Sequence, residues 1–175
     1  MQKNITIKPL QEALFGTYME VGRQAYEQHY LHLWQCKDPD YYIKHSFTRA
    51  VLLDDMKDTD SMQYMVYADE VPAGILKLRK VATPAPLNEN EALLLDKIYL
   101  LKEFSGQGIG SFIIDFVLDF AKKSNKKVVW LETMKKGQAR FFYEKNGFEI
   151  FSEKTLGFPG LIDSERGMFI MKQEV

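Results

Sequence analysis

The strongest pattern of apolar and polar positions is helical and follows a glycine-rich segment near residue 108. Apolar residues recur there at intervals of three and four, as on one face of an amphipathic helix: Ile109, Phe112, Ile113, Phe116, Val117 and Phe120. Weaker helical patterns cover about 10–29 and about 137–145. Asp38-Pro39 predicts the start of another helix, capped by Asp38, with one face formed by Ile43, Phe47, Ala50 and Val51.

Seven other segments have the apolar and alternating pattern of strands. They are bounded by turn residues and cover 5–7, 63–68, 73–78, 91–101, 128–131, 148–151 and 168–171. Strands interspersed with helices predict an α/β (α+β) fold, with a mixed central sheet of about six or seven strands and helices on both faces.

Length and composition are consistent with one domain over residues 1–175. The chain has 46% apolar and 27% charged residues, and the proline-containing segment 82–90 is too short for an interdomain hinge. A net charge of −1 argues against nucleic acid as a partner. The sequence lacks an apolar run of membrane-spanning length and a signal peptide, so we expect a cytoplasmic protein with no membrane partner.

The glycine-rich turn is the first candidate for chemistry. Gly106, Gly108 and Gly110 separate the strand at 91–101 from the amphipathic helix. Backbone N–H groups in such a turn, together with the positive end of the helix dipole, bind an anion such as a pyrophosphate. The spacing is neither that of a dinucleotide-binding fingerprint nor that of a P-loop. By itself the turn is equally well explained as purely structural.

Two motifs together resemble the GNAT superfamily of acyl-CoA-dependent N-acyltransferases. The first runs from Leu95 through the turn to Ser111, and the second is Ala139-Arg140-Phe141-Phe142-Tyr143-Glu144-Lys145-Asn146-Gly147-Phe148. Their order and spacing are those of the family, and there is a looser similarity to its bacterial spermidine/spermine acetyltransferases. Two positions depart from the family pattern, because Ser105 replaces the usual Gln or Arg and Lys136 replaces an Asn.

The resemblance implies acetyl-CoA as the cofactor, with CoA as product. In the family, the backbone of one strand pairs with the pantetheine arm, which here corresponds to Ile98, Tyr99 and Leu100. The turn holds the pyrophosphate, which here corresponds to Gly106, Gln107, Gly108, Ile109, Gly110 and Ser111. Lys136 is a further candidate for contact with the cofactor arm. The family fold also has two central strands that splay apart, and the thioester lies between them.

Tyr143 and Asp96 are the candidate catalytic residues. By resemblance, Tyr143 is the acid that protonates the leaving thiolate, and the alternative is a tyrosine that only packs in the core. Asp96 interrupts an apolar strand, where strict alternation would place it on the same side as Leu94, Ile98 and Leu100. Such a carboxylate is either the base that deprotonates the amine, directly or through water, or one half of a salt bridge.

The acceptor site is the least specified part. The region between the first two helices is aromatic, and Tyr26, Tyr30 and Trp34 are candidate residues for an alkylammonium ion. Glu132 is a further substrate-binding candidate and a reserve base, and its alternative is a solvated strand end. For the aromatic residues the alternative is helix packing. His29 and His32 lack a third ligand, so no metal is predicted.

The predicted function is transfer of an acetyl group from acetyl-CoA to a primary amine by direct attack in a ternary complex. A polyamine or another small amine is the expected acceptor and partner. The alternatives are acetylation of a protein N-terminus or lysine, and a regulatory module that binds CoA without chemistry. Because dimers are common in the superfamily, a homodimer is also expected.

Overall fold

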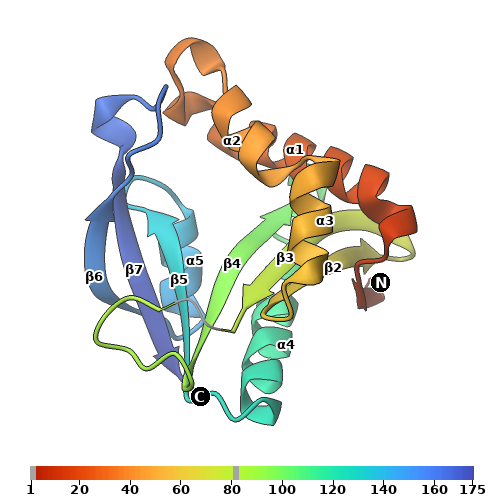
Figure 1. Cartoon of the computed structure of the whole chain (residues 1–175), viewed down its shortest axis with the longest axis vertical. Helices are drawn as coiled ribbons and strands as arrows, with labels where there is room; N and C mark the ends of the chain where they lie inside the picture. Colours follow the sequence, from red (N-terminus) through yellow and green to blue (C-terminus); the bar gives the residue numbers. More distant parts are fainter. Residues whose placement is uncertain (1–2, 81–82) are drawn as a thin grey trace.

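A computed structural model of the chain describes residues 3–80 and 83–175, so Ala82, in the linker-like segment, lies outside the described residues. Seven strands form one sheet in the order β1-β2-β3-β4-β5-β7-β6, as Figure 1 shows. Their bounds are β1 Ile5–Pro9, β2 Ser61–Ala68, β3 Val71–Arg79, β4 Ala92–Leu100, β5 Val128–Met134, β6 Glu149–Thr155 and β7 Gly167–Glu174. Only β4 and β5 pair in parallel, and all other neighbours are antiparallel. The predicted mixed sheet is confirmed.

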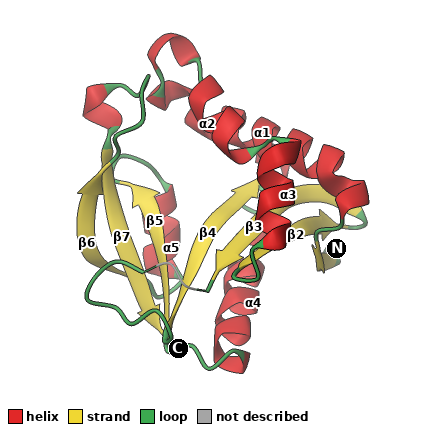
Figure 2. Cartoon of the chain, viewed as in Figure 1, coloured by secondary structure: helices red, strands yellow, loops and turns green. Residues whose placement is uncertain are grey.

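The described residues form five α-helices (Figure 2), of which α2 packs on α3 and the other four pack on the sheet. Their bounds are α1 Phe15–Tyr30, α2 Asp40–Ser46, α3 Arg49–Lys57, α4 Ile109–Lys123 and α5 Ala139–Lys145. The first predicted helix begins later than expected, because Glu12–Leu14 form a separate 3₁₀ turn ahead of α1. Helices α1 and α3 pack on β2, β3 and β4, whereas α4 and α5 pack against β4 and β5.

The prediction of one continuous helix after Asp38-Pro39 was wrong. The segment forms two helices because Thr48 takes an extended conformation and caps α3, its hydroxyl accepting a hydrogen bond from the Val51 N–H at 3.3 Å. Phe47 therefore lies at the break between the helices, where it is buried. Asp38 accepts the Asp40 N–H at 3.0 Å, so α2 begins one residue later than predicted.

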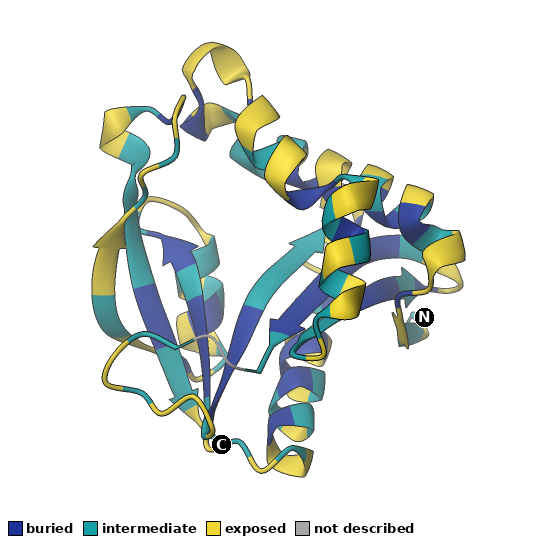
Figure 3. Ribbon diagram, in the orientation of Figure 1, coloured by how far each residue is buried: buried dark blue, intermediate teal, exposed yellow. Residues whose placement is uncertain are grey.

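The apolar face of α4 is also rotated relative to the prediction. Its buried residues are Ile109, Ile113, Ile114, Val117 and Ala121, which follow one line along the helix. Phe112, predicted to lie on this face, is 43% exposed. This face packs against β4 and β5, and the Phe142 ring of α5 fills the space beside Gly110. Figure 3 shows the buried stripe of α4 against the sheet.

Two glycines of α1 test how closely this helix packs on the core. At Gly22 an added methyl group would lie 2.5 Å from the Phe47 ring and 2.9 Å from Ile75, whereas at Gly16 it would meet nothing within 4 Å. We expect Gly22→Ala to lower the free energy of unfolding by about 1–3 kcal/mol through overpacking. Gly16→Ala should leave it unchanged or slightly higher, because alanine favours helix.

Urea denaturation of the two variants measures this difference. Equal stabilities would show that the contact between α1 and Phe47 is looser than described.

Candidate active site

The sheet opens at its centre, where β4 and β5 diverge (Figure 1). The two strands pair only over Ala92–Leu95 and Val128–Leu131. Beyond that point β5 continues to pair with β7, and β4 continues to pair with β3. Strand β4 therefore has no strand partner on its β5 side from Asp96 to Leu100, and the gap between the strands can admit a ligand.

One cavity, of about 550 Å³, lies at the start of α4 and along this free edge of β4. We call it the cofactor cavity. The glycine-rich turn lines it with Ser105, Gly106, Gly108, Gly110 and Ser111. Strand β4 contributes Ile98, Tyr99 and Leu100, and α5 contributes Ala139, Phe142 and Tyr143. The cavity thus brings both sequence motifs to one place.

The three glycines of the turn have different structural roles. Gly106 and Gly108 have φ values of 73° and 81°, a left-handed conformation that other residues rarely adopt. Gly110 has an ordinary φ, but a Cβ there would lie 2.9 Å from the Phe142 ring. Two glycines therefore shape the turn, and the third lets α4 and α5 approach closely.

Three residues predicted to contact the cofactor do not line this cavity. Ile109 is buried in the core, and the Gln107 side chain folds back to donate to the Glu103 carbonyl at 2.5 Å. The Lys136 ammonium instead pairs with Glu165 at 3.0 Å. Their remaining route to a cofactor is through the backbone, which stays a prediction.

His29 also lines the cofactor cavity, although sequence analysis considered it only as a weak metal ligand. Its Nε2 lies 3.0 Å from the carbonyl oxygen of Leu100, at the end of the free edge of β4. It thereby ties α1 to the strand that forms the cavity wall. Across the described part of the chain, no three His, Cys, Asp or Glu side chains gather as a metal site requires.

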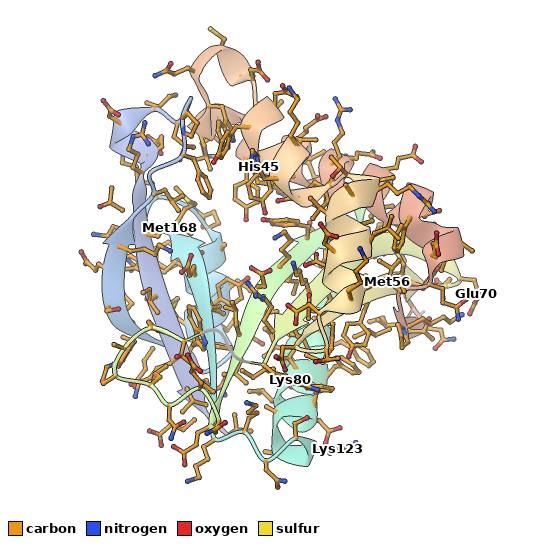
Figure 4. All side chains as sticks on the ribbon, in the orientation of Figure 1. His45, Met56, Glu70, Lys80, Lys123 and Met168 are labelled. Atoms are coloured by element: carbon orange, nitrogen blue, oxygen red, sulfur yellow. The ribbon has the colours of Figure 1, made fainter. Side chains whose placement is uncertain are left out.

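A second cavity, of about 420 Å³, lies between the diverging strands and the first two helices. We call it the acceptor cavity. All four predicted substrate-binding residues line it: Tyr26, Tyr30, Trp34 and Glu132. His45 of α2 and Met168 of β7 also line it, from opposite sides, as Figure 4 shows.

The aromatic wall of the acceptor cavity is itself ordered by contacts between rings. Tyr26 stacks on Tyr42 with 4.1 Å between ring centroids and accepts the Trp34 indole N–H at 3.0 Å. The Tyr42 and Tyr99 hydroxyls lie 2.6 Å apart. Burial raises the pKa of Tyr30 to about 12 and raises the pKa of Tyr99 well above its ordinary value, so these phenols stay protonated at neutral pH. The wall is both a packed cluster and a cavity surface.

The roof of the acceptor cavity could not be foreseen from the sequence. The segment 156–166, between β6 and β7, is joined to the segment after α1 by a bridge between Trp34 and Leu161. The Gln35 N–H also donates to the Gly160 carbonyl at 2.9 Å. Arg166 fixes this roof by donating to the carbonyls of Leu156, Phe158 and Leu161 at 2.9–3.1 Å.

Tyr143 lies where the two cavities meet. It lines both of them, as do Tyr30, Ile98 and Tyr99. Burial, and secondarily the nearby Tyr30, raises the pKa of Tyr143 well above its ordinary value, so the hydroxyl is a donor at neutral pH. The described residues offer this hydroxyl no hydrogen-bond partner, which leaves it available to a ligand.

Asp96 lies at the point where β4 leaves β5. The β3 register runs from Leu78 opposite Leu95 to Lys77 opposite Lys97, so Asp96 is the extra residue of a β-bulge. The expected strict alternation was therefore wrong: Leu94 packs in a separate small cluster, whereas Ile98 and Leu100 pack against the main core.

The Asp96 side chain has both of the features that were predicted as alternatives. Its carboxylate forms ion pairs with Lys77 and Lys97, each at 3.5 Å, and it also lines the acceptor cavity. Lys77 is held more tightly by Asp55, through hydrogen bonds of 2.8 and 2.9 Å. Glu132, the reserve candidate, pairs with Lys154 at 2.7 Å.

Solved structures share this architecture at low sequence identity. PaiA N-acetyltransferase from Thermoplasma acidophilum, in complex with coenzyme A, superposes with a TM-score of 0.78 at 21% identity, covering 98% of this chain and 99% of that one. A chimera of spermidine N-acetyltransferase from Vibrio cholerae gives 0.72 at 16%, covering 99% and 96%. The ribosomal-protein alanine N-acetyltransferase from Escherichia coli gives 0.68 at 14%, covering 98% and 94%. At these identities the likeness establishes the fold alone.

Sequence comparison gives the family. A protein of Lactobacillus delbrueckii subsp. lactis named as an uncharacterized N-acetyltransferase in the pepI 3′ region is 28% identical over 114 residues, which cover 65% of this chain and 64% of that protein. The chain thus spans just under two thirds of the length of this curated relative. The model of the acetyltransferase (GNAT) family matches residues 23–148, which include both motifs. The chain belongs to the acetyltransferase (GNAT) family.

Proposed function

We propose that this chain transfers an acetyl group from acetyl-CoA to the primary amine of a small molecule, by direct attack while both substrates are bound. The observation that carries the proposal is the meeting of two cavities at Tyr143. A donor in the cofactor cavity and an amine in the acceptor cavity would reach each other there without an enzyme-bound intermediate.

The cofactor cavity suits the two polar parts of CoA. The N–H groups of the turn around Gly106 and Gly108, at the start of α4, can bind the pyrophosphate. The free edge of β4 offers backbone donors and acceptors to the amide groups of the pantetheine arm. Ser105 supplies a hydroxyl where the family usually has a longer side chain.

Two residues can move the protons of the reaction. Asp96 would take a proton from the ammonium group, directly or through water, so that the nitrogen lone pair can attack the thioester carbon. The carbon–sulfur bond then breaks, and Tyr143 would donate its proton to the leaving thiolate. The second proton, lost by the nitrogen as the amide forms, would restore the Tyr143 hydroxyl. Asp96 lies 3.5 Å from both Lys77 and Lys97 and lines the acceptor cavity, where the amine would bind.

The roof over the acceptor cavity favours a small acceptor over a protein terminus or a lysine on a protein. Trp34 and Leu161, which line the cavity and form the bridge between the two segments, are almost wholly buried. The aromatic wall suits an alkylammonium ion, and polyamines are therefore one candidate class beside other small amines.

A homodimer and a cytoplasmic location stay predictions. Within residues 3–80 and 83–175, no helix is both long and apolar enough to cross a bilayer.

The decisive experiment is an assay of free thiol release from acetyl-CoA with a panel of amines. The panel contains polyamines, amino acids, alkyl monoamines without a second charged group, and short peptides. We expect turnover of at least one small amine and little or none of the peptides. Binding of CoA in calorimetry without turnover of any amine would instead indicate a regulatory CoA-binding module.

Replacement of Tyr143 tests the proposed acid. Tyr143→Phe keeps the ring packing but removes the hydroxyl, so we expect kcat to fall about a hundredfold with CoA affinity unchanged. Because burial raises the pKa of Tyr143, wild-type kcat should not fall through loss of this proton until well above pH 10. The pH profile of kcat at saturating acceptor measures this, and full activity of Tyr143→Phe would remove the residue from the mechanism.

Replacement of Gly108 tests the anion site. Gly108→Val forces a β-branched residue into a left-handed conformation, which costs about 1–2 kcal/mol and moves the N–H groups of the turn. We expect CoA affinity in calorimetry to fall about tenfold or more.

The matched control is Asn125→Val, which introduces similar strain at an exposed position with φ of 55° near the other end of α4. It should lower stability but leave CoA affinity unchanged. Equal loss of affinity in both variants would attribute the effect to general destabilisation.

A further inference from the structure

The β-bulge places two oppositely charged side chains in the acceptor cavity. In a regular strand, adjacent residues point to opposite faces of the sheet. The extra residue in β4 breaks this alternation, and both Asp96 and Lys97 line the cavity. Their side chains are largely buried, with 25% and 14% exposed. The cavity therefore presents a carboxylate and an ammonium group from neighbouring positions.

Within the protein, both charges are held by long ion pairs of 3.5 Å. The Lys97 ammonium lies 3.5 Å from the Asp96 carboxylate and 5.8 Å from the centre of the Tyr42 ring. The Asp96 carboxylate also forms an ion pair with Lys77 at 3.5 Å, so both groups keep hydrogen-bonding capacity for a ligand. A buried charged group lowers the stability of the protein unless it is hydrogen-bonded. A ligand that supplies the missing hydrogen bonds therefore gains affinity.

Lys97 carries its charge in this position. Burial acts against the charged form, but Tyr42, Asp96 and Asp55 together outweigh it and raise the pKa of Lys97 above its ordinary value. A cationic acceptor in this cavity would therefore meet a fixed positive charge.

The other charges near the cavity are already paired. Lys77 is bound by both oxygens of Asp55, which also accepts a hydrogen bond from Gln63 at 2.5 Å. Glu132 is paired with Lys154. His45 lies with its Nδ1 2.6 Å from the Tyr41 carbonyl oxygen. A polyamine brings several positive charges, whereas the carboxylates of Asp96 and Glu132, which line the cavity, already pair with lysines.

We infer that the acceptor is a small zwitterionic amine of the amino-acid type, which carries an acidic group close to its amine. The amine would bind at Asp96, where it can lose its proton, and the acidic group would bind at Lys97. Opposite charges then face each other across the cavity at both positions. This inference rests on the proposed function and narrows its acceptor class away from polyamines.

The test compares amino acids with their amides, with the amines lacking the carboxylate and with spermidine, in the thiol-release assay. For the best amino acid, we expect kcat/KM at least about tenfold above that of its amide and of spermidine. Lys97→Met keeps the length of the side chain without its charge and should abolish this preference. Lys97→Glu should reverse it in favour of the amide and spermidine.

Lys123→Met is the matched control, because it removes the same charge from an exposed position on α4. It should keep the wild-type preference, and CoA affinity should stay unchanged in all three variants. Preference of the wild type for spermidine or for amines without a carboxylate would overturn the inference and leave the proposed function standing. An equal loss of kcat/KM for all acceptors in Lys97→Met would also overturn the inference and leave the proposed function standing. Absence of turnover with every amine would overturn both.

Discussion

Strands β4 and β5 share hydrogen bonds only as far as Leu95 and Leu131, and the candidate site is arranged around the place where that pairing stops. Each strand keeps its other neighbour, so the sheet opens without losing its continuity. The unpaired side of β4 can then offer backbone groups to a ligand. If the parallel pairing continued to Leu100, β5 would occupy the free edge of β4 that lines both cavities.

The β-bulge at Asp96 coincides with this opening and determines its chemistry. Bulges increase the local twist of a strand and redirect a side chain. Here the extra residue turns the Asp96 carboxylate toward the acceptor cavity, beside Lys97. Lys77 on the neighbouring strand β3 forms an ion pair with this carboxylate. The same irregularity therefore accompanies the separation of the strands and supplies the charged groups that lie between them.

The two cavities are closed by elements that are distant in sequence. Helix α5 supplies Tyr143 at their junction, and the segment 156–166 meets the residues after α1 to roof the acceptor cavity. Trp34 has two structural roles in this arrangement, since it bridges to Leu161 and donates to Tyr26. The acceptor cavity thus depends on packing between the segment that follows α1 and the segment 156–166.

Most of the helices and strands, and the family, were predictable from the sequence, because apolar periodicity and the turn around Gly108 are local properties and the two linked motifs are specific. The sequence also singled out Tyr143 and Asp96. The break at Thr48, the exposure of Phe112 and the bulge that brings Asp96 and Lys97 to one cavity became visible only in the folded chain. These features depend on strand register and on contacts between distant segments, which periodicity along one segment cannot encode.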